Sequence, residues 1–295
     1  MKYRIEILRL MLASLVLSFL PFIASAQLGY GFKVGLNFST ITGEKETDVA
    51  GKQAETAKYV SGFQVGFGLR YNITDAFAVG TEFLFAQKGT EINYDGTGYH
   101  VFRKDNDKII ATGTDKQTID VSNAYIDIPV LAYYKLGRVQ FSGGVNVGVL
   151  ATSRGRGESI FNGKTTSGST LPEIISNLDY HYLTDAAAES IGTELTTINL
   201  DGASADIPKN LGAYYAFDSG DYSLYKRLDV GGNVGVDFFL NDALFLGARL
   251  NYGFLDVTAK NADSSRAALG ADNQPILRDD KDRNISLQLS LGFSF

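Results

Sequence analysis

The chain of 295 residues contains only two histidines, His100 and His181. Tyrosines flank both of them, in Tyr99-His100 and in Tyr180-His181-Tyr182, and such a histidine could act as a general base on a lipid or a peptide. That chemistry needs a nucleophile and an orienting carboxylate within hydrogen-bonding reach. Both histidines fall in long polar segments in which no compact catalytic set stands out. We therefore expect surface-loop histidines, predict no catalytic residue, and keep an enzyme acting on lipid or peptide as the alternative function.

A metal site is the second chemistry that the residue types suggest. The run Arg278-Asp279-Asp280-Lys281-Asp282-Arg283 holds three carboxylates that could bind calcium. It lacks the spacing and the glycine of a dedicated calcium loop, and its three basic residues balance the charge. We predict a solvated, self-neutralised segment, and neither a metal nor a cofactor for the chain. The absence of cysteine excludes disulfides and thiolate sites.

Charged residues within otherwise apolar segments are the third candidate group. Six of them lie on the polar side of segments that alternate between polar and apolar positions: Lys33, Arg70, Glu82, Lys88, Asp237 and Arg249. They could line a pore. If the segments close into a narrow barrel of eight strands, however, side chains just fill the interior. We predict a plug of mutually neutralising charges, with a narrow channel as the weaker alternative.

The alternation itself indicates strands. In the last twelve residues, Asn284–Phe295, every odd position is apolar and every even position is polar or small. A period of two marks a strand with a different environment on each face. Seven further segments repeat the pattern: Tyr30–Ile41, Tyr59–Tyr71, Phe77–Lys88, Val121–Tyr134, Val139–Leu150, Val230–Leu240 and Leu244–Phe254.

The composition of the two faces indicates where they point. The apolar face is rich in Phe, Val and Leu and has almost no charge, whereas the polar face combines glycines with a few large charged residues. In a soluble sandwich or barrel the apolar face would point inward. A lipid-facing apolar surface around a polar interior instead predicts an all-β, eight-stranded antiparallel transmembrane β-barrel.

The segment Val121–Tyr134 is the weakest of the eight. Its alternation places Asp127 inside, but Leu131 and Tyr133 then also point inward. Pro129 lacks the N–H group for one ladder hydrogen bond, so we expect a β-bulge there.

The connections alternate in length. Three are tight turns: Asn72–Ala76, Lys135–Arg138 and Asn241–Ala243. Four are long and polar: Thr42–Lys58, Gly89–Asp120, Ala151–Asp229 and Leu255–Arg283. This asymmetry is typical of bacterial outer-membrane barrels, which have short periplasmic turns and long extracellular loops.

The first residues predict export. A basic start is followed by the apolar stretch Leu10–Ile23 and by Ala24-Ser25-Ala26, the pattern of a signal peptide cleaved between Ala26 and Gln27. We therefore divide the chain into a signal peptide (1–26) and an outer-membrane barrel domain (27–295). Cleavage leaves 24 basic and 32 acidic residues, a net charge of about −8, which argues against a nucleic-acid partner.

Several stretches resemble the PorT-like family of outer-membrane β-barrels, which is common in the Bacteroidota. They are the opening Gly31–Asn37, the strand Tyr125–Pro129, the glycine-rich Phe141–Val149 and the final Phe295. The resemblance covers nearly the whole mature chain. It implies a barrel surrounded by outer-membrane lipids, and a last strand that the barrel-insertion machinery reads.

The long segment Ala151–Asp229 (151–229) has the most functional interest. It contains a helix-like stretch, Thr184–Leu195, followed by several tyrosines that favour a contact surface. Before it, Tyr99–Arg103 and Lys108–Thr112 flank a turn and predict a small hairpin above the membrane. Loops of this length are usually functional or disordered. We expect the extracellular loops to bind a protein partner or surface ligand, or to serve an envelope or secretion assembly, without catalysis.

Overall fold

The structure is a computed structural model that describes residues 27–104, 107–200 and 202–295. The predicted signal peptide, residues 1–26, lies outside the described residues. All regular secondary structure in the described part is β-strand, and no helix there is long and apolar enough to cross a membrane. The strands are β1 (Leu28–Thr42), β2 (Glu55–Lys58), β3 (Val60–Asn72), β4 (Phe77–Lys104), β5 (Asp107–Leu136), β6 (Val139–Thr165), β7 (Ile174–His181), β8 (Leu195–Leu200), β9 (Ala203–Pro208), β10 (Asn210–Leu211), β11 (Leu228–Phe239), β12 (Leu244–Gly253), β13 (Ser264–Leu269), β14 (Pro275–Leu277) and β15 (Arg283–Ser294).

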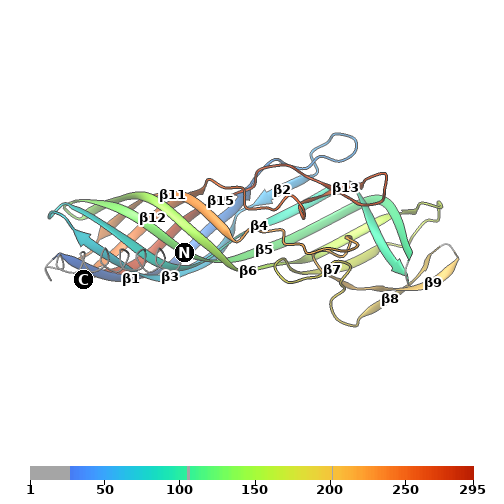
Figure 1. The fold of residues 1–295 in the computed structure, drawn as a ribbon, viewed down its shortest axis with the longest axis horizontal. Coiled ribbons are helices and arrows are strands. Elements are labelled where there is room, and N and C mark those ends of the chain that lie inside the picture. Colours follow the sequence, from blue (N-terminus) through green and yellow to red (C-terminus); the bar gives the residue numbers. More distant parts are fainter. Residues whose placement is uncertain (1–26, 105–106, 201) are drawn as a thin grey trace, which may run out of the picture.

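Eight of these strands form a closed antiparallel ring (Figure 1). Its order is β1-β3-β4-β5-β6-β11-β12-β15, and β15 pairs with β1 to close it, with Phe32 opposite Phe293. Each of the eight segments predicted from the alternation lies within one strand of the ring or matches it to within about two residues at its ends. The predicted eight-stranded barrel and its closure are therefore confirmed.

The faces of the ring have the predicted orientation. On β1, Phe32, Val34 and Leu36 are about half exposed on the outside, whereas Lys33 and Asn37 are buried inside. Phe32 stacks on Phe293 across the closing pair, with ring centroids 5.3 Å apart. Cross-strand aromatic pairs of this kind stabilise a sheet and here belong to the outer apolar belt.

The bulge predicted at Pro129 is wrong. The register of β5 against β6 is constant from Tyr125 to Leu136 and shifts instead between Ala124 and Tyr125. Next to Pro129 the ladder with β4 is interrupted for two positions, but it resumes in the same register, and Thr81 donates a hydrogen bond to the carbonyl of Pro129 (3.0 Å). The missing N–H group is thus accommodated by a local gap in pairing rather than by an extra residue. Asp127, Leu131 and Tyr133 all point inward, as predicted.

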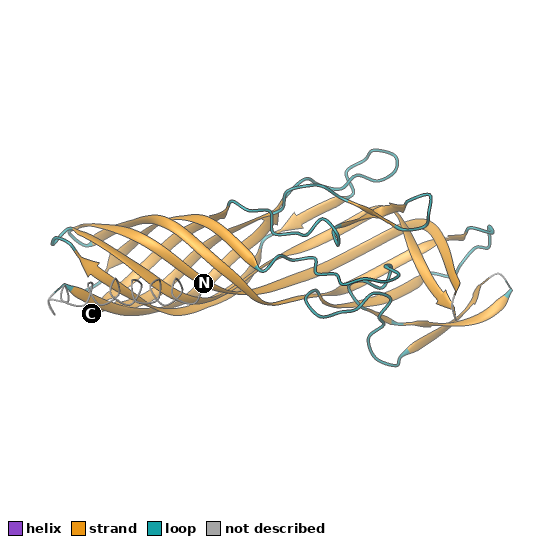
Figure 2. Ribbon diagram, viewed as in Figure 1, coloured by secondary structure: helices purple, strands orange, loops and turns teal. Residues whose placement is uncertain are grey.

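Three strands of the ring continue far beyond the barrel (Figures 1 and 2). β4, β5 and β6 have 28, 30 and 27 residues, whereas about 9–11 residues suffice for a tilted strand to cross a membrane. The expectation of long loops at Gly89–Asp120 and in the first part of Ala151–Asp229 is therefore wrong, because residues 89–104, 107–120 and 152–165 remain paired as strands. The predicted hairpin around residues 99–112 is confirmed as the upper part of the long β4–β5 hairpin.

The extension is a sheet in its own right. β2 pairs with the outer edge of β4, β7 pairs with β6, and β10 adds to β7 in parallel, while β8–β9 and β13–β14 form separate two-stranded hairpins. The helix predicted at Thr184–Leu195 is wrong, because this stretch forms turns up to the start of β8. Ala188 (φ 62°) and Gly192 (φ 78°) adopt left-handed backbone conformations that an α-helix cannot contain.

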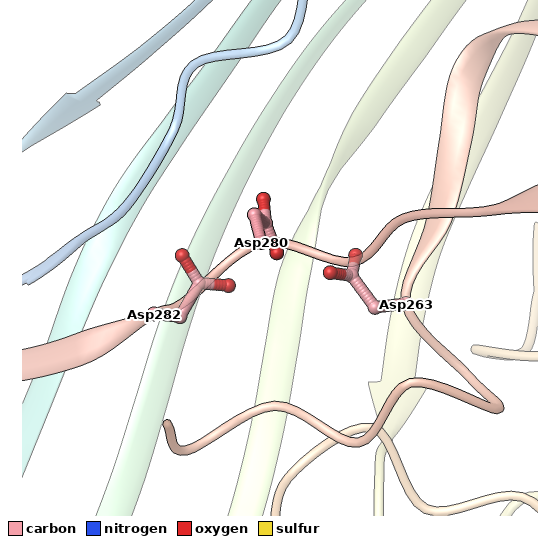
Figure 3. Close-up of side chains that lie close together, drawn as sticks. All are labelled: Asp263, Asp280 and Asp282. Carbon is pink, nitrogen blue, oxygen red and sulfur yellow. The ribbon is translucent and has the colours of Figure 1, made fainter. Parts of the chain in front are cut away.

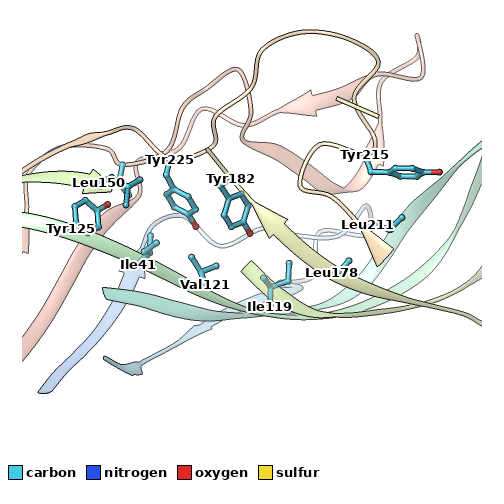
Figure 4. Packing of buried hydrophobic residues seen from close by; sticks show 11 residues of the cluster. Ile41, Ile119, Val121, Tyr125, Leu150, Leu178, Tyr182, Leu211, Tyr215 and Tyr225 are labelled. Atoms are coloured by element: carbon cyan, nitrogen blue, oxygen red, sulfur yellow. The ribbon is translucent and has the colours of Figure 1, made fainter. Parts of the chain in front are cut away.

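An apolar cluster lies where the barrel opens into the extension (Figure 4). Barrel strands contribute Ile41, Tyr125 and Leu150, and the extension packs Tyr182 and Tyr225 onto them. The two tyrosine rings meet edge-on with centroids 5.1 Å apart. The extension is therefore packed onto the mouth of the barrel by burial of apolar surface.

Candidate functional site: the filled lumen and the pocket above it

The half of the lumen nearer the tight turns, called the lower half below, is organised around Glu82 on β4. Its carboxylate accepts a hydrogen bond from Lys33 Nζ (2.7 Å) and two from Arg249 (2.7 and 2.9 Å). The hydroxyl of Tyr133 donates a further bond to it (3.2 Å). These side chains come from β1, β4, β5 and β12, so a single carboxylate links four strands of the barrel. A bidentate hydrogen bond between an arginine and a carboxylate is among the stronger polar contacts in proteins.

A second chain of contacts crosses the same level. Arg70 donates to Gln140 (2.8 Å) and to Ser294 (2.9 Å), and Gln140 in turn donates to Asp237 (3.1 Å). Asp237 thus supplies a second negative charge beside the three cations of this half. The cavity among these residues measures only about 60 Å³.

The upper half of the lumen contains a separate buried ion pair. Lys88 Nζ lies 2.8 Å from Asp127, and both side chains are almost completely inaccessible. Asn146 donates to the same carboxylate (3.1 Å). Gly148 leaves the space that Asp127 occupies, because a Cβ atom there would lie 2.4 Å from its carboxylate oxygen. The predicted pairing of the inward charges is confirmed for Lys33, Glu82, Arg249 and Lys88. Arg70 and Asp237 are instead linked through the neutral Gln140. Together these side chains form a polar plug below the apolar cluster.

His100 is not a loop residue, contrary to expectation. It lies on the extended part of β4, is 8% exposed, and packs against Phe102 and Phe161 with ring centroids 4.7 and 5.6 Å away. Burial lowers its pKa to about 4, so the imidazole is neutral at pH 7. The sequence did not reveal the burial of His100, because β4 is much longer than a strand needs to be to cross the membrane. His100 is best described as a core residue of the extension.

His181 is the last residue of β7, and the expectation of a surface loop is wrong for it too. Its Nδ1 lies 3.4 Å from the carboxylate of Asp185. The same carboxylate accepts hydrogen bonds from the backbone N–H groups of His181 and Ala213, both 2.9 Å. Asp185 therefore fixes the turn after β7 against the segment that follows β10. A histidine next to a carboxylate is part of the catalytic arrangement that the sequence analysis considered. In this structure the carboxylate of Asp185 also holds the turn after β7 in place.

Two aspartates of the segment 278–283, Asp280 and Asp282, lie close to Asp263 from an earlier connection. Asp263, Asp280 and Asp282 place one oxygen each within 4.8 Å of the others, from the residues before β13 and before β15 (Figure 3). Arg278 forms an ion pair with Asp280, and Thr258 donates to Asp282 (3.1 Å). Burial and the Asp280 carboxylate raise the pKa of Asp263 to about 7 and that of Asp282 to about 6. Near neutral pH the cluster therefore shares a proton, while an arginine supplies part of its counter-charge.

A pocket that the sequence did not reveal lies inside the extension. It measures about 160 Å³ and is enclosed by the inner face of β4–β7 on one side and by residues 211–217 and 262–266 on the other. Asp115 and Ser159 lie in its wall, on β5 and β6. In residues 115–121 of β5 the odd positions are buried or half-buried and the even positions are exposed. The sequence gives no clear signal of this, because Asp115 and Gln117 are polar like the exposed residues between them.

The ring of eight strands, the outer apolar belt and the filled polar interior define the chain as an eight-stranded outer-membrane β-barrel protein. Residues 23–259 match the model of the family described as outer membrane protein beta-barrel domain, and the chain belongs to this family. The protein therefore resides in the bacterial outer membrane, with its short turns periplasmic and the extension extracellular.

Solved structures of outer-membrane barrels are similar to this chain at low sequence identity. The attachment invasion locus protein Ail of Yersinia pestis is 11% identical, with a TM-score of 0.35 over 91% of this chain and 99% of Ail. OprG of Pseudomonas aeruginosa is 12% identical, with a TM-score of 0.30 over 90% and 95% of the two chains. The outer membrane protease OmpT of Escherichia coli is 6% identical, with a TM-score of 0.29 over 92% and 98%. No curated protein matches the chain significantly in sequence.

Proposed function

We propose that this protein is a non-catalytic binding or assembly component of the outer membrane that acts through its extracellular extension. The observation that carries the proposal is the continuation of β4, β5 and β6 into an ordered sheet with apolar cores of its own. One of these cores packs Ile198 and Ile207 of the β8–β9 hairpin against Phe102 and Phe161 of the sheet. A rigid scaffold that presents connecting segments is the usual arrangement of a recognition surface.

The filled lumen supports a role outside the barrel rather than through it. Paired charges occupy both halves of the interior, and the apolar cluster covers its extracellular mouth. Transport of a solute would require both to rearrange. The partner we propose is a protein or a surface ligand of the envelope, and the finer assignment to the PorT-like barrels, with a role in envelope or secretion assembly, is part of this proposal. It is supported by the stretches Gly31–Asn37 and Tyr125–Pro129.

The experiment is affinity capture from detergent-solubilised membranes with a barrel-only variant. Leu150 N–H donates to Arg227 O (2.7 Å), and Thr90 pairs with Val121, so residues 152–226 and 91–120 can each be replaced by a two-residue turn. We expect a stoichiometric partner with the full-length protein and none with the barrel-only variant, although both migrate as heat-modifiable barrels. Asp75→Asn, in a periplasmic turn, is the control and should retain the partner. Capture of the same partner by the barrel-only variant would place the interaction elsewhere.

The enzyme alternative depends on the contact between His181 and Asp185. We expect the purified protein to leave lipid and peptide substrates unchanged. Hydrolysis that His181→Ala abolishes in a barrel that still folds would replace the proposed function by catalysis. His100→Ala is a poor test of catalysis, because it leaves a cavity in the core of the extension.

A further inference from the structure

The extracellular pocket has the size of a small-molecule site. Its volume of about 160 Å³ is close to the roughly 150 Å³ that accommodates a benzene-sized molecule in a protein interior. Its walls come from β4, β5, β6 and β7 and from two connecting segments, so it is built by residues far apart in the sequence. It lies above the membrane and apart from the charges in the lumen.

The wall of the pocket contains a buried carboxylate without a cation of its own. Asp115 is 3% exposed, and its two oxygens accept hydrogen bonds from Ser159 and Gln117, both 2.7 Å. Both donors are neutral, and in the part of the chain that the structure describes Asp115 forms no ion pair. A buried charge without a counter-ion is costly, and burial accordingly raises the pKa of Asp115.

The positive charge of Arg266 favours the ionised form of Asp115, but the two side chains form no ion pair among the described residues. Arg266 lines the same pocket, but its guanidinium is held by Glu55 (3.4 Å) and Glu46 (3.8 Å). The backbone N–H of Arg266 also donates to Glu46 (2.8 Å). Asp263 adds a further carboxylate to the pocket wall. The local balance of charge is therefore negative, with Asp115 left to face the cavity.

Aromatic rings make up much of the remaining wall. Six rings of tyrosine and phenylalanine line the pocket, beside the imidazole of His100: Tyr99, Tyr180, Tyr182, Tyr214, Tyr215 and Phe217. The hydroxyl of Tyr99 donates to the carbonyl of Ser265 (3.3 Å), which fixes one side of the pocket. Aromatic faces attract cations, and groups of rings around an alkylated ammonium are the recognised arrangement for binding it.

We propose that this pocket binds a small organic cation, a primary or quaternary ammonium group, whose charge lies against Asp115 and whose alkyl groups lie against the tyrosine rings. The site goes beyond the proposed partner binding and does not depend on it. A neutral ligand of the same shape would leave the carboxylate uncompensated, so charge rather than size determines which ligands bind.

The test uses the full-length protein in detergent micelles and two probes of similar shape, tetramethylammonium and neutral tert-butanol. Saturation-transfer NMR reports binding of each probe. Asp115→Asn keeps the size and much of the hydrogen bonding of the side chain but removes its charge. Glu158→Gln is the matched control, because Glu158 precedes Ser159 on β6 and is exposed on the opposite face of the sheet. Near-ultraviolet circular dichroism of the tyrosines verifies that each variant retains the packed extension.

We expect saturable binding of tetramethylammonium to the wild type and to Glu158→Gln, and binding at least about tenfold weaker to Asp115→Asn, as the loss of one charged contact predicts. Equal binding of tert-butanol would make the pocket a merely apolar cavity and overturn the proposal. Unchanged affinity in Asp115→Asn, or the absence of saturable binding to the folded wild type, would do the same. If Asp115→Asn does not fold, Tyr180→Leu removes one ring while keeping an apolar side chain, and it must weaken the binding of tetramethylammonium but not that of tert-butanol.

Discussion

Glu82 shows how single residues determine what this lumen can do. One carboxylate faces Lys33 and Arg249 at 2.7 Å each, in an interior where neither cation has ready access to water. Removing one partner of a buried ion pair leaves an uncompensated charge, which is far more costly than losing a surface pair. The plug therefore depends on Glu82 more than on any of the surface charges.

Glu82→Gln should lower the free energy of unfolding by about 3–5 kcal/mol, the usual cost of breaking a buried pair. The control is Glu91→Gln, whose partner Lys58 is largely exposed, so its loss should cost less than about 1 kcal/mol. Urea unfolding of the barrel in lipid vesicles, followed by loss of heat-modifiable migration, measures both. Equal effects of the two substitutions would show that Glu82 is not the centre of the plug.

At the scale of elements, the stability of the segments that bring Asp263 next to Asp280 and Asp282 depends on pH. Folding raises the pKa of Asp263 from its ordinary 3.8 to about 7. Between these values the folded protein binds more protons than the unfolded chain, so stability falls as the pH rises through this window. The packing of the β13–β14 hairpin onto the extension should accordingly be tighter at pH 5 than at pH 8.

Asp263→Asn should reduce this dependence to the smaller contribution of Asp282, whose pKa is raised to about 6, and make the extension more stable than the wild type at pH 8. Hydrogen exchange of the amides in β13 and β14 at pH 5 and pH 8, corrected for the intrinsic effect of pH on exchange, measures the local stability. Asp279→Asn is the control, because Asp279 is exposed and lies outside the cluster. A wild-type extension that is more stable at pH 8 than at pH 5 would contradict the assignment of the shared proton.

The whole molecule combines a barrel closed by distant segments with an extension outside it. Val34 on β1 is paired with Leu291 on β15, so the first and last strands of the barrel lie side by side. Directly opposite residues in antiparallel strands have Cβ atoms about 4.5–5.5 Å apart. Since the chain has no cysteine of its own, engineered pairs report this closure without background.

Val34→Cys with Leu291→Cys should cross-link readily and retain a compact band on an unboiled gel. The pair Val34→Cys with Val145→Cys joins strands that are not neighbours in the ring and should not form an intramolecular link. Cross-linking of the second pair but not of the first would disprove closure between β1 and β15.

The orientation of the molecule makes a separate prediction for living cells. Residues 218–221 form an exposed segment of the extension between β10 and β11, and exposed loops are the usual sites of proteolysis. Proteinase added to intact cells should cut there first and leave the barrel strands intact. Cleavage that requires permeabilisation of the outer membrane would mean that the extension faces the periplasm.

The barrel could be derived from the sequence by itself, whereas the extension and its pocket could not. Lipid on one face and a polar lumen on the other impose strict alternation on every spanning strand, so residues such as Phe32 and Lys33 reveal their orientation without a structure. The tight turns, the inward charges and the closure of the ring follow from the same constraint.

Outside the membrane that constraint disappears, and only the tertiary structure determines the arrangement. Both faces of the extended strands can be covered by other segments or by water, so polarity no longer separates a strand from a loop, and His100 reads as exposed although it is buried. Asp115, Ser159 and Arg266 become neighbours only because three strands extend together and two distant connections fold over them. The sequence alone determined which strands face lipid, whereas only the tertiary packing determined which residues surround the pocket of the extension.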